Sequence, residues 1–486
     1  MMPASPKARS GEGGTLADRD RACVWHPYTQ MQTAPPPLPI VGGKGVYLYT
    51  EDGRRILDGI SSWWVNIHGH SHPVLNAALA AQAARLEHVM FAGCTHPAAV
   101  DLAERLVSRL PRGLTRVFYS DNGSTAVEVA VKLATQYWIN TGEPQRRTFV
   151  TLHHGYHGDT VGAMSVSGDS IFTRAFAPLL FPVMRAHAPY CYRCPLGLQR
   201  ASCGVDCLGD LEQTLAALRD TAAAVIVEPM LQGAGGMIVW PAEFLAGVRR
   251  LCDRFGVLLI ADEVLTGFGR TGRMFACEHA GITPDIICLS KALTAGYLPL
   301  GATCTTDAVY GAFLSDDRSR TFFHGHSFTA NPLACAVALA SLELFDRDDT
   351  LARVKRLEAQ LQSGLAPLVE LPLVGDVRVI GGVGAIELVA GPADLKGPRR
   401  DGEGPRRDDE GLRRDDEGPR LDDGYLDAIG PRLAAAFLDR GLLLRPLGNI
   451  VYFMPPYVIT EDETAWAIDQ IGDVLELEMG VRRGGP

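Results

Sequence analysis

Residues 256–293 read GVLLIADEVLTGFGRTGRMFACEHAGITPDIICLSKAL, and two apolar runs in this stretch indicate the fold. The runs GVLLIADEV and DIICLSKAL have the composition of buried strands, and charged side chains follow their apolar parts, Asp262 in the first and Lys291 in the second. Comparable runs upstream, TRVFYS, TFVTLH and AAAVIVEPM, alternate with amphipathic segments. Strands that alternate with helices predict an α/β protein with a mostly parallel sheet covered by helices on both faces.

Polar residues follow several of these predicted strands, where parallel sheets bind their ligands. Gly123 and Ser124 open a helix whose free N–H groups could hold a phosphate, although an ordinary helix cap would look the same. Tyr156, in the glycine-flanked segment HGYHGDT, could cover a flat ring. A carboxylate such as Asp262 at the end of an apolar strand is costly unless it meets a cation or several hydrogen-bond donors. A structural ion pair would also meet this need. Partial burial of Lys291 would make its amine nucleophilic.

Lysines are rare in this chain, and Lys291 is one of only six. The other five lie in the N-terminal segment, in a glycine-rich segment, on helical faces or beside a charged insert, so Lys291 is the one candidate for a Schiff base. A phosphate anchor, a ring-covering aromatic side chain, an acid and an amine are what pyridoxal phosphate requires of a protein. The four features together therefore predict this cofactor.

The composition limits the class of protein. The chain has 486 residues, of which 47% are hydrophobic, and its net charge of -10 disfavours nucleic acid and anionic membranes as partners. No apolar run approaches the ~20 residues of a membrane span, and the first residues lack the apolar stretch of a secretory signal. We therefore expect a cytoplasmic protein whose cysteines are reduced.

The chain divides into segments of different character. Residues 1–20 lack periodicity and are expected to be a disordered tail. Repeats such as GPRRDDE fill residues 395–424 and predict a disordered, solvated insert, because their glycines and prolines exclude a coiled coil. We place the N-terminal part of a small domain at 21–75, a large cofactor-binding domain at 76–340 and the C-terminal part of the small domain at 341–486.

Four segments resemble the class III aminotransferases of the fold type I pyridoxal phosphate family: TLHHGYHGDT, VEPMLQGAGGM, LLIADEVLTGFGRTG and DIICLSKALTAGYLPLGA. The resemblance extends from about residue 22 to residue 480, apart from the repetitive insert. It implies a large domain with a mostly parallel sheet between helices and a smaller α+β domain built from both chain ends. It also implies pyridoxal 5'-phosphate as cofactor and a homodimer as the active unit.

The resemblance assigns roles to single residues. Lys291 would bind the cofactor as a Schiff base and move protons, and Asp262 would keep the ring nitrogen protonated. Gly123 and Ser124 would hold the phosphate, and Tyr156 would cover the ring. In such dimers a second loop reaches the phosphate from the neighbouring subunit, and in this chain that loop reads FFHGHSF. The residues it would contribute are Gly325, His326 and Ser327.

A substrate pocket is implied in the same way. Arg445 would bind the carboxylate of the substrate as a bidentate partner. Simple core packing is the alternative explanation for the two adjacent tryptophans of this pocket. The other residues expected in the pocket are Tyr28, Trp63, Trp64, Tyr156, Lys291 and Gly325.

Further segments, VWHPYTQM, DGISSWWVNIHGH, HVMF and LRPLGNIVYFMPPY, are similar to members of the class that aminate 8-amino-7-oxononanoate in biotin biosynthesis. The expected amino donor is S-adenosylmethionine. Lysine is the alternative donor, because His326-Ser327 stands where adenosylmethionine-using members tend to have Pro-Thr. An ω-amino-acid transaminase and, from another reaction class, an aminomutase are further alternatives.

Four cysteines in PYCYRCPLGLQRASCGVDC have a spacing that could hold a structural zinc ion. The first pair is embedded in an aromatic turn, so we favour free thiols in a surface loop and expect no metal. The four residues are Cys191, Cys194, Cys203 and Cys207.

Overall fold

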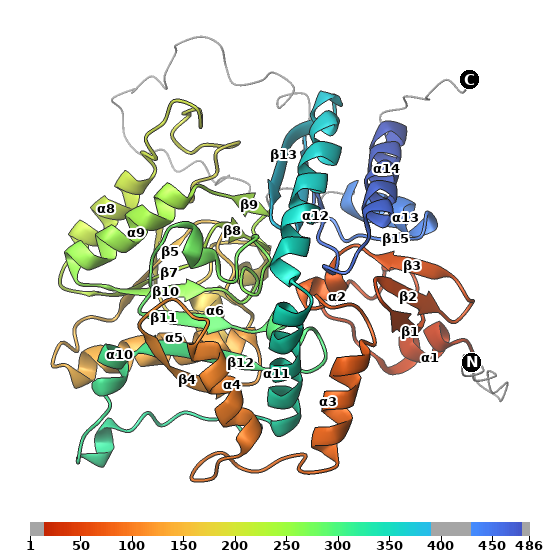
Figure 1. The fold of residues 1–486 in the computed structure, drawn as a ribbon. Helices are drawn as coiled ribbons and strands as arrows, with labels where there is room; N and C mark the ends of the chain where they lie inside the picture. The colour runs from red at the N-terminus through yellow and green to blue at the C-terminus, as the bar shows by residue number, and fades with distance from the viewer. Residues whose placement is uncertain (1–13, 390–428, 479–486) are drawn as a thin grey trace, which may run out of the picture.

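The computed structural model describes residues 14–389 and 429–478 (Figure 1). Most of the predicted tail and the whole predicted insert, residues 395–424, lie outside the described residues. The prediction of a tail through residue 20 is wrong, because helix α1 (Leu16–Cys23) begins within it. Thr15 and Asp18 cap this helix reciprocally, each side chain accepting a hydrogen bond from the backbone N–H of the other.

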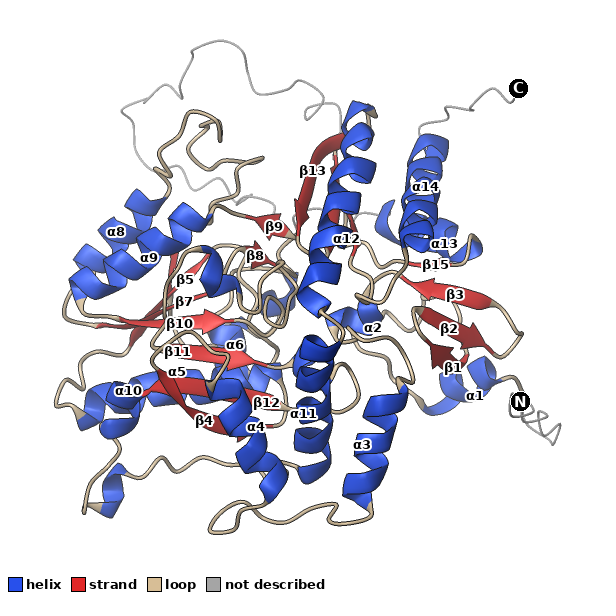
Figure 2. Cartoon of the chain, in the orientation of Figure 1, coloured by secondary structure: helices blue, strands red, loops and turns tan. Residues whose placement is uncertain are grey.

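A seven-stranded sheet with the order β4-β12-β11-β10-β7-β5-β6 forms the centre of the structure (Figure 2). Neighbouring strands are parallel, except that β12 runs antiparallel to both β4 and β11. The predicted mostly parallel sheet is therefore confirmed. Its strands are β4 (Leu114–Ser120), β5 (Thr148–Leu152), β6 (Met184–Ala186), β7 (Ala222–Val227), β10 (Leu258–Asp262), β11 (Ile286–Leu289) and β12 (Gly301–Thr306).

Alternate residues of the central strands face opposite sides of the sheet, as the two-residue period of a strand requires. In β10, Leu258 and Ile260 pack against the helix that follows β4, whereas Leu259 packs with the helices that precede β7 and β10. Both faces are thus buried, which explains why the strands are apolar throughout. The helices that cover the sheet include α4 (Pro97–Val107), α5 (Gly123–Asn140), α8 (Leu208–Ala217), α9 (Ala242–Phe255) and α11 (Pro332–Arg347).

Both ends of the chain contribute to one small sheet with the order β1-β2-β3-β15, in which β15 pairs parallel to β3. A three-stranded antiparallel sheet, β13-β14-β16, lies in the C-terminal part. This arrangement confirms an α+β part built from both ends, while the exact domain boundaries stay predictions. The strands are β1 (Ile40–Lys44), β2 (Tyr47–Thr50), β3 (Arg55–Asp58), β13 (Val374–Ile380), β14 (Val383–Leu388), β15 (Leu442–Leu443) and β16 (Ile450–Phe453).

The remaining elements connect or cover these sheets. Helices α3 and α11 pack side by side below the small sheet (Figure 1). The remaining helices and strands are α2 (Ser61–Trp64), α3 (Pro73–Ala83), α6 (Val161–Ser165), α7 (Ile171–Arg174), α10 (Asp307–Gly311), α12 (Thr350–Leu365), α13 (Ile429–Asp439), α14 (Glu461–Glu478), β8 (Leu231–Gln232) and β9 (Ile238–Val239).

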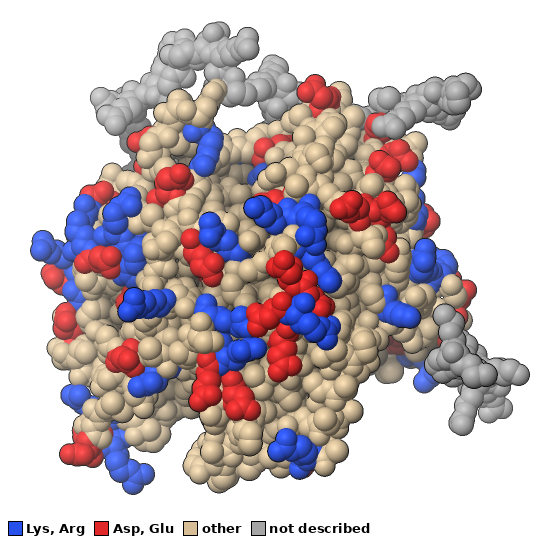
Figure 3. Space-filling model, viewed as in Figure 1, with Lys and Arg blue, Asp and Glu red and all other residues tan. Residues whose placement is uncertain are grey.

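Basic and acidic side chains are intermixed over the face shown in Figure 3, without a large patch of one sign. None of the helices in the described part of the chain combines the length and the apolar character that crossing a membrane requires.

Candidate active site

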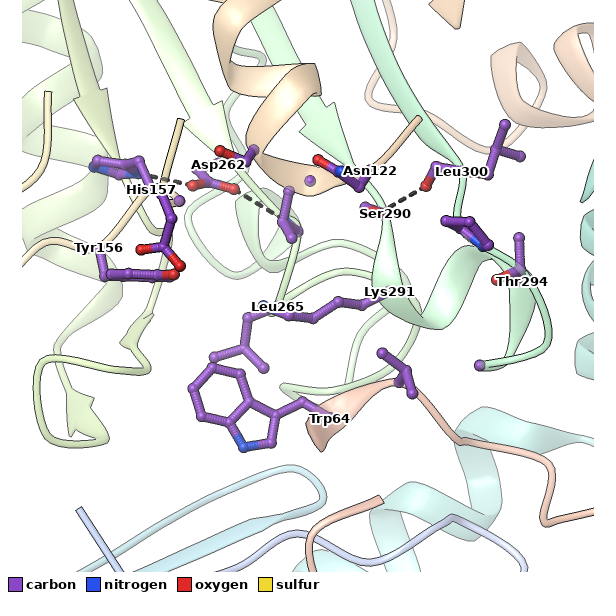
Figure 4. A pocket seen from close by; sticks show the side chains of 18 of the residues that line it. Trp64, Asn122, Tyr156, His157, Asp262, Leu265, Ser290, Lys291, Thr294 and Leu300 are labelled. Carbon is purple, nitrogen blue, oxygen red and sulfur yellow. Dashed lines mark hydrogen bonds and ion pairs between the residues drawn. The ribbon is translucent and has the colours of Figure 1, made fainter. Parts of the chain in front are cut away.

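A cavity of about 690 Å³ lies beyond the carboxyl ends of the central strands (Figure 4). Five strands each supply lining residues at or just after their last residue, as expected for ligand sites of parallel sheets. In the order β4, β5, β7, β10 and β11, these residues include Asn122, Tyr156, Glu228, Asp262 and Lys291.

Lys291 begins a short 3-10 turn directly after β11, with a left-handed φ of 43°. Its Nζ lies 4.8 Å from the centre of the Trp64 ring, and Figure 4 shows the side chain extending above that ring. Burial lowers the pKa of the Lys291 amine, while the negative charges of Asp262 and Glu228 act in the opposite direction. More of the amine is therefore neutral near pH 7 than in an exposed lysine, which favours nucleophilic attack on an aldehyde.

Two acids, Asp262 and Glu228, and the histidine His157 line the other side of the cavity. The carboxylate of Asp262 is buried, and its Oδ2 lies 2.7 Å from Nδ1 of His157. Its other oxygen accepts a hydrogen bond from the backbone N–H of Val264 at 3.1 Å. Burial raises the pKa of Glu228 to about 7, and the charge of Asp262 adds to this increase. Asp262 is thus held by two neighbours while it still faces the cavity.

The start of α5 supplies a cradle for an anion. Asn122 caps the helix, because its side-chain oxygen accepts the N–H of Thr125 at 3.0 Å. A Cβ at Gly123 would lie 2.5 Å from a methyl carbon of Val264, so only glycine allows this close approach. Gly123 and Ser124 both line the cavity, and the first N–H groups of a helix have no partner within it. A phosphate fits this position, as an acid and an amine fit the ring nitrogen and the aldehyde of pyridoxal phosphate.

Aromatic side chains form the outer part of the site. The ring centres of Tyr28 and Trp63 are 5.5 Å apart, and the hydroxyl of Tyr28 contacts both the carboxylate of Asp159 and the hydroxyl of Tyr156. Burial raises the pKa of the Tyr156 hydroxyl, so this group stays protonated. The guanidinium carbon of Arg445 lies 4.5 Å from the centre of the Trp63 ring. In the described part of the chain, Arg445 has no acidic partner and remains available for a carboxylate.

The two tryptophans lie on a left-handed turn. From Ser61 to Trp64 the φ angles are 50°, 45°, 69° and 73°, although none of these residues is glycine. Backbone hydrogen bonds from the N–H of Trp64 and of Val65 reach back four residues, as in a helix of opposite hand. A left-handed helical conformation costs roughly 1–2 kcal/mol for each such residue. No local pattern in the sequence indicates this turn. The turn gives the adjacent rings of Trp63 and Trp64 different neighbours.

The sequence-predicted residues fall into three groups. Trp63 adjoins the cavity wall through its neighbour Trp64, while Tyr28 and Arg445 contact Trp63. Those that line the cavity are Trp64, Gly123, Ser124, Tyr156, Asp262 and Lys291. Tyr28, Trp63 and Arg445 do not line the cavity themselves, and neither do Gly325, His326 and Ser327 of the same chain.

The loop with Gly325 and His326 is largely exposed in the single chain. Nδ1 of His326 lies 3.0 Å from Oδ2 of Asp121, which precedes the start of α5. The proposed action of this loop on the cofactor of a second chain depends on the homodimer, and both stay predictions.

Two buried charged residues near the site were not named from the sequence. Glu228 follows the apolar strand β7 just as Asp262 ends β10, so the same pattern could have identified it. Arg270 is fully buried and donates one hydrogen bond, at 3.2 Å, to the carbonyl oxygen of Trp64. Its charge also lowers the pKa of Lys291. Nothing in its local sequence distinguishes Arg270 from a surface arginine.

The four cysteines of the aromatic turn line one small cavity away from the site. All four are free thiols in the structure. Among residues 14–389 and 429–478, no three or more His, Cys, Asp or Glu side chains are arranged to hold a metal ion. The residues concerned are Cys191, Cys194, Cys203 and Cys207.

A buried lysine, an acid at a strand end and a helix start that can hold phosphate, on this sheet, define a pyridoxal-phosphate enzyme of fold type I. The family model described as "Aminotransferase class-III" matches residues 28–475. The chain belongs to this family, so it is an aminotransferase and pyridoxal phosphate is its cofactor.

Comparisons with individual proteins agree with this family assignment. The chain is 47% identical to the adenosylmethionine-8-amino-7-oxononanoate aminotransferase of Geobacter sulfurreducens, over 97% of this chain and 98% of that protein. The crystal structure of the protein of the same name from Methanocaldococcus jannaschii superposes with a TM-score of 0.84 at 36% identity, covering 95% of this chain and 98% of that one. A PLP-bound amine transaminase from an uncultivated Pseudomonas species also has a TM-score of 0.84 at 36% identity, with 93% and 98% covered.

Proposed function

We propose that this chain transfers an amino group from S-adenosylmethionine to 8-amino-7-oxononanoate and so forms 7,8-diaminononanoate for biotin biosynthesis. Arg445 supports the proposal most directly, because it is a cation beside an aromatic wall and has no acidic partner among the described residues. The same wall continues through Trp63 and Trp64 to the amine of Lys291. An acceptor with a ketone toward one end and a carboxylate at the other matches these two separated groups.

Lys291 is proposed to hold the cofactor and to move the proton at the carbon that gains or loses the amino group. When bound, pyridoxal phosphate supplies an aldehyde that takes up the amino group and a protonated ring that withdraws electrons. Burial of Lys291 supports its role, because an amine with a lowered pKa can act as a nucleophile and a base near neutral pH.

Asp262 is proposed to keep a proton on the ring nitrogen of the cofactor. Its negative charge, in a buried position, stabilises a nearby cation more strongly than it would in water. The contact with His157 keeps the carboxylate in one orientation. Gly123 and Ser124 would bind the phosphate with N–H groups, and Tyr156 would cover the ring.

The outer aromatic side chains favour S-adenosylmethionine over lysine as donor. This donor has a sulfonium cation and a flat adenine ring, and both interact favourably with aromatic faces. Trp63 is 38% exposed and Tyr28 43% exposed, so both rings can be reached from solvent. Lysine would need an acid for its distant ammonium group. Asp159 lines the cavity near Tyr28, but it already accepts a hydrogen bond from the hydroxyl of Tyr28.

A second candidate is an ω-amino-acid or amine transaminase. The amine transaminase from Pseudomonas matches this fold as well as the oxononanoate enzyme does, with the same TM-score of 0.84. Such an enzyme would share Lys291, Asp262 and the phosphate cradle, so the substrate wall must distinguish the two activities.

Purified chain loaded with cofactor, supplied with 8-amino-7-oxononanoate and one donor at a time, tests the proposal. We expect 7,8-diaminononanoate, detected by mass spectrometry, with S-adenosylmethionine and less product with lysine. A higher rate with lysine would reverse the donor assignment, and an isomer of 8-amino-7-oxononanoate, formed without any donor, would indicate an aminomutase. Turnover of a simple amine with pyruvate, without conversion of 8-amino-7-oxononanoate, would overturn the proposed function in favour of the second candidate.

A further inference from the structure

One carboxylate accepts several hydrogen bonds from the start of the left-handed turn Ser61–Trp64. Asp58, the last residue of β3, is fully buried. Its Oδ1 accepts the backbone N–H of Ser62 at 2.9 Å and that of Ile60 at 3.3 Å. Its Oδ2 accepts the hydroxyl hydrogen of Ser62 at 2.7 Å. Three of the hydrogen-bond donors at the start of the turn therefore converge on a single side chain.

A histidine holds this carboxylate from the other side. Nε2 of His70 lies 2.9 Å from Oδ2 of Asp58. Asn66 directs the ring, because its oxygen accepts the N–H of Gly69 at 2.8 Å and its NH2 group donates to Nδ1 of His70 at 3.0 Å. Nδ1 is thereby an acceptor, so Nε2 carries the hydrogen that is donated to Asp58.

The turn connects this polar cluster to both parts of the active site. Trp64 lies beside the amine of Lys291, and its indole N–H donates to the hydroxyl of Tyr452 at 3.1 Å. Trp63, the preceding residue, lies against Arg445 and Tyr28. A turn of the usual hand would rotate consecutive side chains in the opposite sense, and both rings could not keep these neighbours.

We propose that Asp58, Ser62 and His70 are positioning residues for substrate binding, which act by holding Trp63 and Trp64 in a backbone conformation that their own preferences oppose. The carboxylate offsets the strain of the turn by accepting donors that only the left-handed form directs at it. None of the three residues lines the cavity, so their effect reaches the substrate through the two tryptophans. The inference rests on the proposed function for the choice of assay substrate.

A matched pair at Ser62 tests the inference. Ser62→Ala and Ser62→Gly both lose the hydroxyl group, but only glycine adopts a left-handed φ without strain. We expect Ser62→Ala to raise KM for 8-amino-7-oxononanoate several-fold and Ser62→Gly to raise it clearly less, with kcat changed little in both. Equal KM values for the pair would overturn the inference.

Asp58→Asn tests the carboxylate. Asparagine keeps one acceptor but presents an NH2 group to the donors of Ser62 and His70, so we expect KM to rise roughly tenfold, as loss of a charged hydrogen bond would give. The cofactor absorption band should remain. Adding Ser62→Gly to Asp58→Asn should recover part of the KM increase, because the turn then needs less support. No recovery, or a KM that Asp58→Asn leaves unchanged, would contradict the inference.

Asp285→Asn is the control, because Asp285 also accepts a backbone N–H, from Leu259 at 2.7 Å, and pairs with Arg249, but outside the cavity. It should lower the temperature of unfolding without a change in KM. If Asp58→Asn does not fold, the Ser62 pair still decides the inference. If the wild type does not convert 8-amino-7-oxononanoate, the proposed function fails, and the same pair is compared with the amino acceptor that the wild type does use.

Discussion

The start of α5 and the turn at Ser61–Trp64 both shape the same cavity. The local sequence favours the backbone conformation of the first and disfavours that of the second. At α5 an asparagine cap, a glycine and a serine favour the conformation that the structure shows, and this conformation exposes N–H groups. At the turn four residues without a single glycine adopt a left-handed backbone. The anion cradle therefore needs little support from elsewhere, whereas the tryptophan wall depends on Asp58, a residue of β3.

This contrast separates a cofactor side of the cavity from a substrate side. The cofactor side comprises the strand ends with Asp262 and Lys291 and the start of α5. The substrate side comprises the left-handed turn with Trp63 and Trp64, and Arg445. Changes on the first side should affect cofactor state and kcat, and changes on the second should affect KM.

Replacement of Lys291 should produce the largest effect, because it removes the function of the cofactor side. Lys291→Ala removes the amine that would bind the cofactor, so the absorption band of the covalently held cofactor and the turnover should both disappear. The spectrum of the purified variant and a product assay check this. Lys355→Ala, on an exposed face of α12, is the control and should keep both. A band that survives in Lys291→Ala would contradict the assignment.

Asp262→Asn should give the next largest effect. Asparagine has nearly the same shape but no negative charge to stabilise a protonated ring nitrogen, so kcat should fall roughly 10²–10³-fold. Cofactor should still bind, because Lys291 and the phosphate cradle are unchanged. Steady-state kinetics with the spectrum of the variant provide the measurement. Turnover near that of the wild type would mean that another acid, such as Glu228, serves the ring.

Arg445→Met should affect the substrate side alone. Methionine keeps an apolar side chain against Trp63 but cannot bind a carboxylate, so KM for 8-amino-7-oxononanoate should rise roughly 10–100-fold. The cofactor band should not change. Arg440→Met is a matched control in the same segment, because Arg440 pairs with Asp473 away from the cavity. If both variants bind the substrate equally well, Arg445 does not recognise the carboxylate.

The pH dependence of cofactor uptake should show the smallest effect and sharpen the account of Lys291. Only the neutral amine attacks an aldehyde, and burial lowers its pKa from the ordinary value of 10.5. Uptake of pyridoxal phosphate by the cofactor-free protein, followed by absorbance, should therefore reach its half-maximal rate below that pH.

Glu228→Gln should lower the pH at which cofactor uptake reaches its half-maximal rate still further. Burial raises the pKa of Glu228 to about 7, so above this pH its negative charge raises the pKa of Lys291, and glutamine removes that charge. Glu343→Gln, at an exposed position of α11, should leave the midpoint in place. A shift to higher pH in Glu228→Gln would contradict the electrostatic coupling between these groups.

Much of the cofactor side could be predicted from the sequence. Asp262 and Lys291 follow apolar runs, and because parallel strands share the edge at which they end, residues far apart in the chain had to meet there. The same reasoning applied to Glu228 would have identified a third charged residue. The start of helix α1 within the expected tail was missed, although Thr15 and Asp18 form a capping pair that local sequence encodes.

The sequence by itself determined the parallel sheet, the position of its polar strand ends and the family, because these depend on local periodicity and on motifs that stay close together in the chain. Only the tertiary structure decided the hand of the turn at Ser61–Trp64, the approach of Asp58 and His70 to it, and the contact between Trp63 and Arg445. Trp63 and Arg445 are far apart in the chain, and His70 lies twelve residues from Asp58. Asp58 is only four residues from Ser62, but this spacing does not by itself predict a left-handed turn. The turn in particular opposes the intrinsic preference of its residues, so only contacts made after folding can stabilise it.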